Sequence, residues 1–241
     1  ILFSCCNISI YEKNYSFNRY FNFIIFFGHV MLYRLFIKIY PGSQVWVIMG
    51  CFLLPSTLYF SSGIHKDGLV LLLMAVVIYG VYQSLSKNRI SIKRLLFILA
   101  GLILLFLVRN FILLALLPAL FAWILVAKTK WNTALVFISV YLFGGLAFFN
   151  INAVITKINP PDIIVKKQEA YKSLPIAATQ IELAALQPTV KSFASNIPQA
   201  LGHVLFLPYP GQQPVKSLLP FSFELYFYLF LLLLLFFFKK K

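Results

Sequence analysis

Three adjacent residues, His65, Lys66 and Asp67, carry the side chains best suited to chemistry in this 241-residue chain. They place a base, a cation and a carboxylate next to one another. Uncharged runs of 27 and 19 residues flank the Lys66–Asp67 pair. Because a charged group in the membrane interior costs roughly 2.5–3.5 kcal/mol on insertion scales, a charged cluster between two apolar runs predicts a polar site at a membrane face.

Each of these side chains has a functional and a simpler interpretation. In the functional one, His65 or Asp67 takes a proton and Lys66 binds the substrate. In the simpler one, Asp67 precedes the start of a helix, where a carboxylate caps free N–H groups and complements the helix dipole, and Lys66 contacts lipid phosphate.

Arg109 is the one charged residue among the 33 residues 95–127. A guanidinium at membrane depth pairs with a carboxylate, a phosphate or a water-filled cavity, so Arg109 is a candidate substrate-binding residue. The alternative is an interfacial arginine at the tip of a helical hairpin, touching lipid headgroups.

Glu224 follows Pro220 by about one helical turn, near the start of the last apolar run. It is a candidate catalytic carboxylate, and a structural ion pair with Arg109 or Lys66 is the alternative. Because an arginine next to hydrocarbon needs an anion, we expect Arg109 to lie within one side-chain length of the 65–67 cluster or Glu224.

The composition indicates a membrane protein. Hydrophobic residues make up 61% of the chain and charged residues 11%, whereas a soluble domain carries about 25% charged residues. The net charge of +15 comes from cations at the ends of apolar runs, without a basic face, which argues against nucleic-acid binding. The three cysteines have no metal-site spacing and no nucleotide-binding motif is present, so we expect neither a metal nor a cofactor.

The hydropathy pattern predicts an all-α fold, a polytopic bundle of about seven membrane segments with a helical outer loop. A full span needs about 20 mostly apolar residues. The two segments beside Arg109 are short, which indicates a tight or partly re-entrant hairpin. The predicted segments are 20–38, 44–60 (with Pro55 as an internal kink), 68–85, 95–108, 111–126, 132–149 and 220–238.

The region 150–216 differs in kind from the apolar segments, because it holds eight of the twelve prolines. Proline suits the first helical turn, so we expect short amphipathic helices over 175–186 and 198–207. We expect most of 162–207 to form an ordered helical lid. The predicted division is a transmembrane bundle over 1–149, an extracytoplasmic loop over 150–216, and a last transmembrane helix with a basic end over 217–241.

The basic residues predict the orientation. With seven segments, the loops on one side hold 11 of the 21 basic residues and none of the six acids. The positive-inside rule makes that side cytoplasmic and puts 61–67 and 150–216 outside. The same count places Ile1 outside, which suggests that an upstream span is missing from this sequence.

The stretch Leu54-Pro55-Ser56 followed by Ser61 to Gly68 resembles a motif of bacterial membrane proteins grouped with O-antigen polymerases and GT-C lipid-sugar glycosyltransferases. The arginine-bearing hairpin and the proline-rich outer loop are similar too. The resemblance implies an inner-membrane enzyme of cell-surface polysaccharide assembly with a polyprenyl-diphosphate-linked sugar as substrate. The acidic residue common in the first outer loop of GT-C enzymes has no secure match; the candidates are Glu12 and a residue of the N-terminal part expected to be missing from this sequence.

The alternative function is a non-enzymatic membrane subunit, with partner membrane subunits, or a transporter. In either, the same polar residues would line a path or pair structurally.

The orientation can be tested by labelling from outside the cell. A cysteine introduced by Lys172→Cys should react with a membrane-impermeant maleimide, and one introduced by Lys87→Cys should not. The reverse pattern would overturn the orientation.

Overall fold

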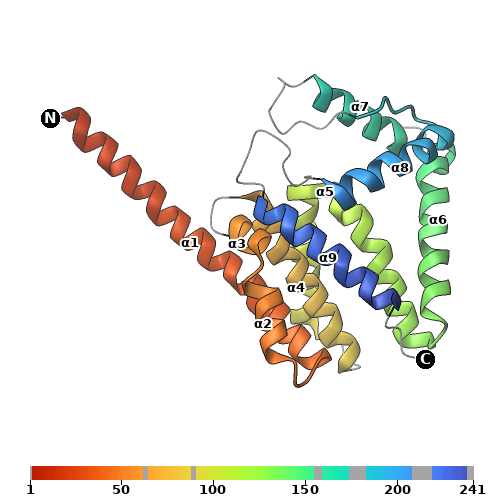
Figure 1. Cartoon of the computed structure of the whole chain (residues 1–241), viewed down its shortest axis with the longest axis horizontal. Helices are drawn as coiled ribbons and strands as arrows, with labels where there is room; N and C mark the ends of the chain where they lie inside the picture. The colour runs from red at the N-terminus through yellow and green to blue at the C-terminus, as the bar shows by residue number, and fades with distance from the viewer. Residues whose placement is uncertain are drawn as a thin grey trace. The chain divides into compact units, whose positions relative to one another are not determined.

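The computed structural model describes residues 2–61, 65–87, 91–154, 159–173, 183–207 and 219–237. Over these residues the regular elements are all α-helices. They fall into two compact units, 1–137 and 138–241, and Figure 1 labels their helices. The helices are α1 (Leu2–Ile39), α2 (Gln44–Phe52), α3 (Pro55–Ser61), α4 (Lys66–Ser86), α5 (Ile92–Thr129), α6 (Thr133–Val154), α7 (Pro160–Lys172), α8 (Val190–Phe206) and α9 (Leu219–Phe237).

Four helical stretches in the described part of the chain are long and apolar enough to cross a membrane: Asn18–Ile39, Lys66–Ser86, Ile92–Thr129 and Thr133–Ala153. A shorter apolar helix covers Leu219–Leu234. Helices satisfy their own backbone hydrogen bonds, which lipid cannot do. The all-α membrane fold is therefore seen, whereas the count of seven segments is not confirmed. The predicted division at residues 149 and 216 stays a prediction.

The segment predicted as one span over 44–60 is two short helices. α2 ends at Phe52, Leu53 and Leu54 are not helical, and Pro55 begins α3. Proline lacks an N–H and disfavours helical backbone at the residue before it, so Pro55 breaks the helix instead of kinking it. At ~1.5 Å per residue neither piece spans a bilayer alone. At the N-terminus, α1 begins at Leu2, so the helix of the predicted first span, 20–38, starts well before residue 20.

α4 is the central helix of the first unit, and it contacts α1, α3 and α5. Three glycines permit these close approaches. A Cβ on Gly28 of α1 would lie 2.7 Å from the Leu72 Cα, and a Cβ on Gly80 would lie 2.7 Å from Ile98 Cγ1. Gly101 packs against Val77 in the same way. Small residues at helix contacts are typical of membrane proteins, where association depends on close packing.

α5 is interrupted at Arg109, whose φ of −149° and ψ of 81° are not helical. Ile98, before the break, and Trp123, after it, pack in one apolar cluster around Val77 and Val81 of α4. In a straight helix these two residues would lie about 38 Å apart. The parts of α5 before and after Arg109 therefore pack against the same stretch of α4, and Figure 1 shows α5 as two limbs.

In the second unit, side-chain amides bind a segment without regular secondary structure, 183–187. Gln168 of α7 donates to the Ala184 carbonyl at 3.0 Å and accepts from the Leu186 N–H at 3.0 Å. Gln199 of α8 accepts from the Ala184 N–H at 3.1 Å. The helix expected over 175–186 is therefore absent from 183–186, where backbone groups bond to glutamines, and its remainder, 175–182, lies outside the described residues.

α8 begins earlier than predicted. Thr189 caps it by accepting from the Ser192 N–H at 3.3 Å, so the helix starts at Val190 and Pro198 lies inside it. The ring of Phe193 packs against Phe148 and Phe149 of α6, with centroids 5.9 and 5.3 Å away. Most of the described part of 162–207 is helical, in α7 and α8, as the sequence pattern predicts.

The close approach at Gly28 gives a stability prediction. Gly28→Ala should destabilise the protein by about 1–3 kcal/mol, because the new methyl meets the α4 backbone rather than a flexible side chain. The measurement is loss of folded monomer on heating in detergent. Gly144→Ala in α6 is the matched control, since a Cβ there meets no atom within 4 Å. Equal thermal stability of the two variants would contradict the packing.

Candidate functional site

The site is built on an ion pair between α4 and the break in α5. The Arg109 Nη2 donates to the Asp67 Oδ1 at 2.9 Å, joining residues 42 positions apart in the chain. The two side chains are 35% and 45% exposed, respectively. The expectation that Arg109 lies within a side-chain length of the 65–67 cluster is confirmed, and the role of the pair stays a prediction.

The local fold positions Asp67 for this contact. His65 is the N-cap residue of α4 with extended backbone, and its side chain does not cap the helix. Lys66 and Asp67 are the first two helical residues, so Asp67 lies inside the first turn rather than before it. A carboxylate there complements the positive end of the helix dipole. The same position aims it at Arg109.

Arg109 lies beside an apolar cluster, with Val108 before it and Ile112 after it both packed on that cluster. Leu105, one turn earlier, is buried with Val70 and Leu73 of α4. The guanidinium carbon lies 5.5 Å from the centroid of the Phe111 ring, a favourable cation–π distance. A guanidinium has five N–H donors, and the ion pair uses one nitrogen of the fork. The arrangement holds the cation while leaving donor capacity for an anionic ligand.

His65 and Lys66 come directly before Asp67 in the sequence. The His65 ring stacks on Tyr59 of α3, with centroids 5.3 Å apart and planes at 22°. His65 is partly exposed and Lys66 is exposed. Ser61 donates its hydroxyl to the Thr57 carbonyl at 2.6 Å, a local helix contact. The remainder of the predicted 61–67 loop, residues 62–64, lies outside the described residues.

Glu224 belongs to the second unit. It is buried, and its Oε1 accepts a hydrogen bond from the Tyr228 hydroxyl at 2.7 Å, one turn further along α9. Pairing of Glu224 with Arg109 or Lys66 would be a contact between the two units, and it stays a prediction. The catalytic role of Glu224 stays a prediction too.

Sequence reasoning did not select Tyr59 or Phe111, the aromatic partners of His65 and Arg109. Aromatic residues make up 17% of the chain, so their presence near a charge carries little signal. Spacing does not help, because the Tyr59–His65 contact crosses the end of one helix and the start of another. No group of three or more His, Cys, Asp or Glu side chains with metal-site geometry occurs among the residues described.

The ion pair should appear as non-additivity between mutations. Asp67→Asn and Arg109→Gln should each lower the Tm by a few degrees, since about 1 kcal/mol shifts Tm by roughly 2–4 °C at this size. The double variant should be no less stable than the worse single one, because each change breaks the same contact.

The control for this cycle is Arg94→Gln, which removes a 3.2 Å hydrogen bond from Arg94 to the Gln83 carbonyl. Its effect on the Tm should add to that of Asp67→Asn. Additive effects of Asp67→Asn and Arg109→Gln would show that the two side chains do not stabilise each other.

Comparison with known proteins finds no matching family model, curated protein or solved structure. The resemblance to O-antigen polymerases and GT-C transferases therefore stays a prediction.

Proposed function

We propose that this chain is an integral membrane enzyme of cell-surface polysaccharide assembly, transferring a sugar from a polyprenyl-diphosphate carrier. The observation that carries the proposal is the Arg109–Asp67 ion pair at the break in α5. The pair brings a cation to the start of α4, where His65 and Lys66 directly precede Asp67. A cation beside a base suits a reaction with an anionic leaving group.

In this reaction the acceptor hydroxyl attacks the anomeric carbon of the carrier-linked sugar. The carbon–oxygen bond to the diphosphate breaks as the new glycosidic bond forms. The acceptor proton moves to a base of the protein, and the diphosphate leaves with its charge stabilised by Arg109 and Lys66. Atoms and charge balance with the carrier-linked sugar and the acceptor as the two substrates.

The base is His65 or a carboxylate. His65 is the better candidate of the two at the α4 start, because Asp67 is engaged by Arg109. A neutral imidazole has one nitrogen that accepts a proton, and stacking on Tyr59 fixes the plane of the ring. Asp67 then positions Arg109, and Glu224 is the alternative carboxylate.

The proposed function also requires a particular arrangement of α5 in the membrane. The two limbs of α5 form a hairpin of half-spans with Arg109 at its tip, which is supported by their shared packing against α4. The charge asymmetry of the loops supports a site on the outer face of a bacterial inner membrane, with 150–216 on the same side.

A non-enzymatic membrane subunit or a transporter is the second candidate, favoured by the interruption of α5. Broken helices in transporters point their free backbone groups at substrates near the middle of the membrane. In that function Arg109 and Asp67 would pair to hold the break, and no bond would be made or cleaved.

Arg109→Lys tests the proposal in purified protein reconstituted into nanodiscs. Binding of polyprenyl diphosphate and transfer from a panel of polyprenyl-diphosphate-linked sugars are measured. We expect transfer to fall roughly 10²-fold, because an ammonium cannot reproduce the two-pronged guanidinium contact. His65→Ala should abolish transfer and leave carrier binding unchanged.

Arg94→Lys is the matched control, because Arg94 lies at the far end of the α4–α5 contact and bonds the Gln83 carbonyl. It should leave binding and transfer unchanged. Absence of carrier binding by the unaltered protein would remove the enzyme proposal and favour the second candidate.

A further inference from the structure

Helix α8, in the second unit, carries an exposed apolar stripe. Val190, Ile197, Leu201 and Val204 follow one another at intervals of seven, four and three residues, which places them on one face of the helix. Each of the four side chains is more than half exposed. Exposed apolar side chains that gather on one helix face indicate an interaction surface.

The other side of α8 is polar and is used within the unit. Gln199 accepts a hydrogen bond from the Ala184 N–H at 3.1 Å. Asn196 and His203 line a groove together with Gln199. The polar side of α8 therefore binds the 183–187 segment, and the apolar stripe is left exposed.

A contact with α6 gives the level of α8 relative to the membrane. Phe193 packs its ring against Phe148 and Phe149. The apolar stretch of α6 that is long enough to cross a membrane ends at Ala153, so Phe149 lies only about 6 Å from that end. Figure 1 shows α8 crossing this end of α6 rather than running alongside it. The start of α8 is therefore at the level at which α6 would leave the membrane.

The end of α8 contacts a second apolar helix, α9. The Tyr226 hydroxyl donates to the Phe206 carbonyl at 3.4 Å. Tyr226 lies seven residues after Leu219, or about 10 Å along α9, and tyrosine favours the membrane–water interface. The 17 residues of α8 reach about 26 Å, less than the ~30 Å of a hydrocarbon core. A position along the membrane surface fits these contacts better than a span.

The stripe continues the lipid-facing surface of the unit. Leu142 and Leu146 of α6 are more than half exposed, as expected of side chains that face lipid. On α8, Ile197 follows Phe193 by one turn, so the stripe adjoins the contact with α6. Residues 190–206 contain no Asp or Glu, so no carboxylate of α8 opposes lipid phosphate.

We propose that α8 is an interfacial helix, whose apolar stripe inserts into the bilayer at the boundary between headgroups and acyl chains. The partner is the lipid surface itself. The polar side of α8, with the 183–187 segment bound to it, faces water. This inference does not depend on the proposed sugar transfer or on which membrane face the second unit occupies.

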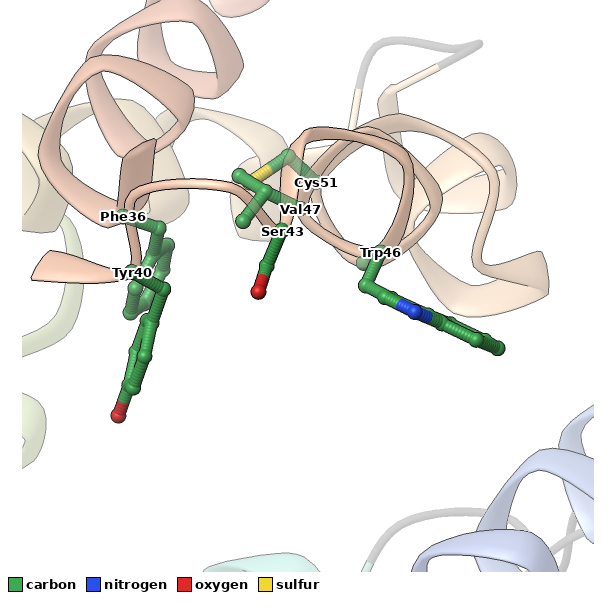
Figure 2. Close-up of a pocket in the computed structure, with 7 residues that line it drawn as sticks. Phe36, Tyr40, Ser43, Trp46, Val47 and Cys51 are labelled. Carbon is green, nitrogen blue, oxygen red and sulfur yellow. The ribbon is translucent and has the colours of Figure 1, made fainter. Parts of the chain in front are cut away.

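The test measures the depth of nitroxide spin labels on α8, with the full chain in nanodiscs of phosphatidylcholine and phosphatidylglycerol. The native cysteines are replaced first. Cys5 and Cys6 are changed to serine, and Cys51 to alanine because it is buried on α2 (Figure 2). Collisions of each label with oxygen, which dissolves in lipid, and with a water-soluble nickel chelate are then measured.

Labels are attached one at a time at Leu201→Cys, Val204→Cys and Ser195→Cys. On the stripe, at positions 201 and 204, oxygen collisions should exceed nickel collisions, at a depth roughly 5–10 Å below the headgroup boundary. Ser195 is the matched control, because it is exposed and lies on the opposite side of the helix from Val204. Nickel collisions should exceed oxygen collisions there.

A charge in the stripe should lift α8 out of the lipid. With the label at Leu201→Cys, Val204→Asp should lower the ratio of oxygen to nickel collisions to the value found at position 195. Ser195→Asp is the control substitution, and it should leave the ratio at position 201 unchanged.

Equal nickel access at positions 195, 201 and 204 would show that the stripe lies in water, and would overturn the proposal. Few collisions with either reagent at 201 and 204 would show that protein covers the stripe, which also overturns it. Spin–spin broadening that disappears on dilution with unlabelled chain would identify that cover as a second copy. The three single labels decide between these outcomes even if Val204→Asp does not fold.

Discussion

The need of one guanidinium for an anion shapes the first unit. Arg109 is the only formal charge in 95–127, and residues on both sides of it pack on the buried cluster of Leu105, Val70 and Leu73. Arginine does not lose its proton in proteins. The chain therefore has to bring an acceptor to it, and the nearest acid in sequence before it is Asp67. A 2.9 Å contact between them fixes where α5 stops being helical relative to the start of α4.

The ion pair alone would not hold the helices together, because exposed pairs contribute little. Close packing between the helices supplies the rest of the stabilisation. Gly28 admits α1 onto the α4 backbone, while Gly80 and Gly101 admit the first limb of α5 from another side. The second limb then completes the two apolar clusters through Ile112 and Leu120. The ion pair sets the position of α5 along α4, and the glycines let the helices approach closely enough to pack.

The long apolar helices and the ion pair between distant residues could be predicted from the sequence. The local breaks in helical structure could not. The apolar runs around 20–38 and 68–85 are helices as predicted, because mostly apolar runs near 20 residues have few other structures in a membrane. The Arg109–Asp67 contact followed from the scarcity of anions. Pro55 was expected to kink a span and instead separates two helices, since its effect depends on whether neighbours replace the lost hydrogen bond. The irregular 183–187 segment depends on hydrogen bonds to Gln168 and Gln199, and glutamine side chains give no periodic signal in the sequence.

The exposure of the ion pair bears on what it does. The protein covers the pair only in part, since the Arg109 and Asp67 side chains are 35% and 45% exposed, respectively. Asp67 takes one nitrogen of the fork, so the guanidinium is pinned in orientation and only partly neutralised. A phosphate approaching it meets Asp67 as a like charge, which weakens binding, and Lys66 on the adjacent position offsets that repulsion. In the proposed sugar transfer, such a balance suits an anion that arrives, gains charge during the reaction and then leaves, which is the requirement of a leaving-group site.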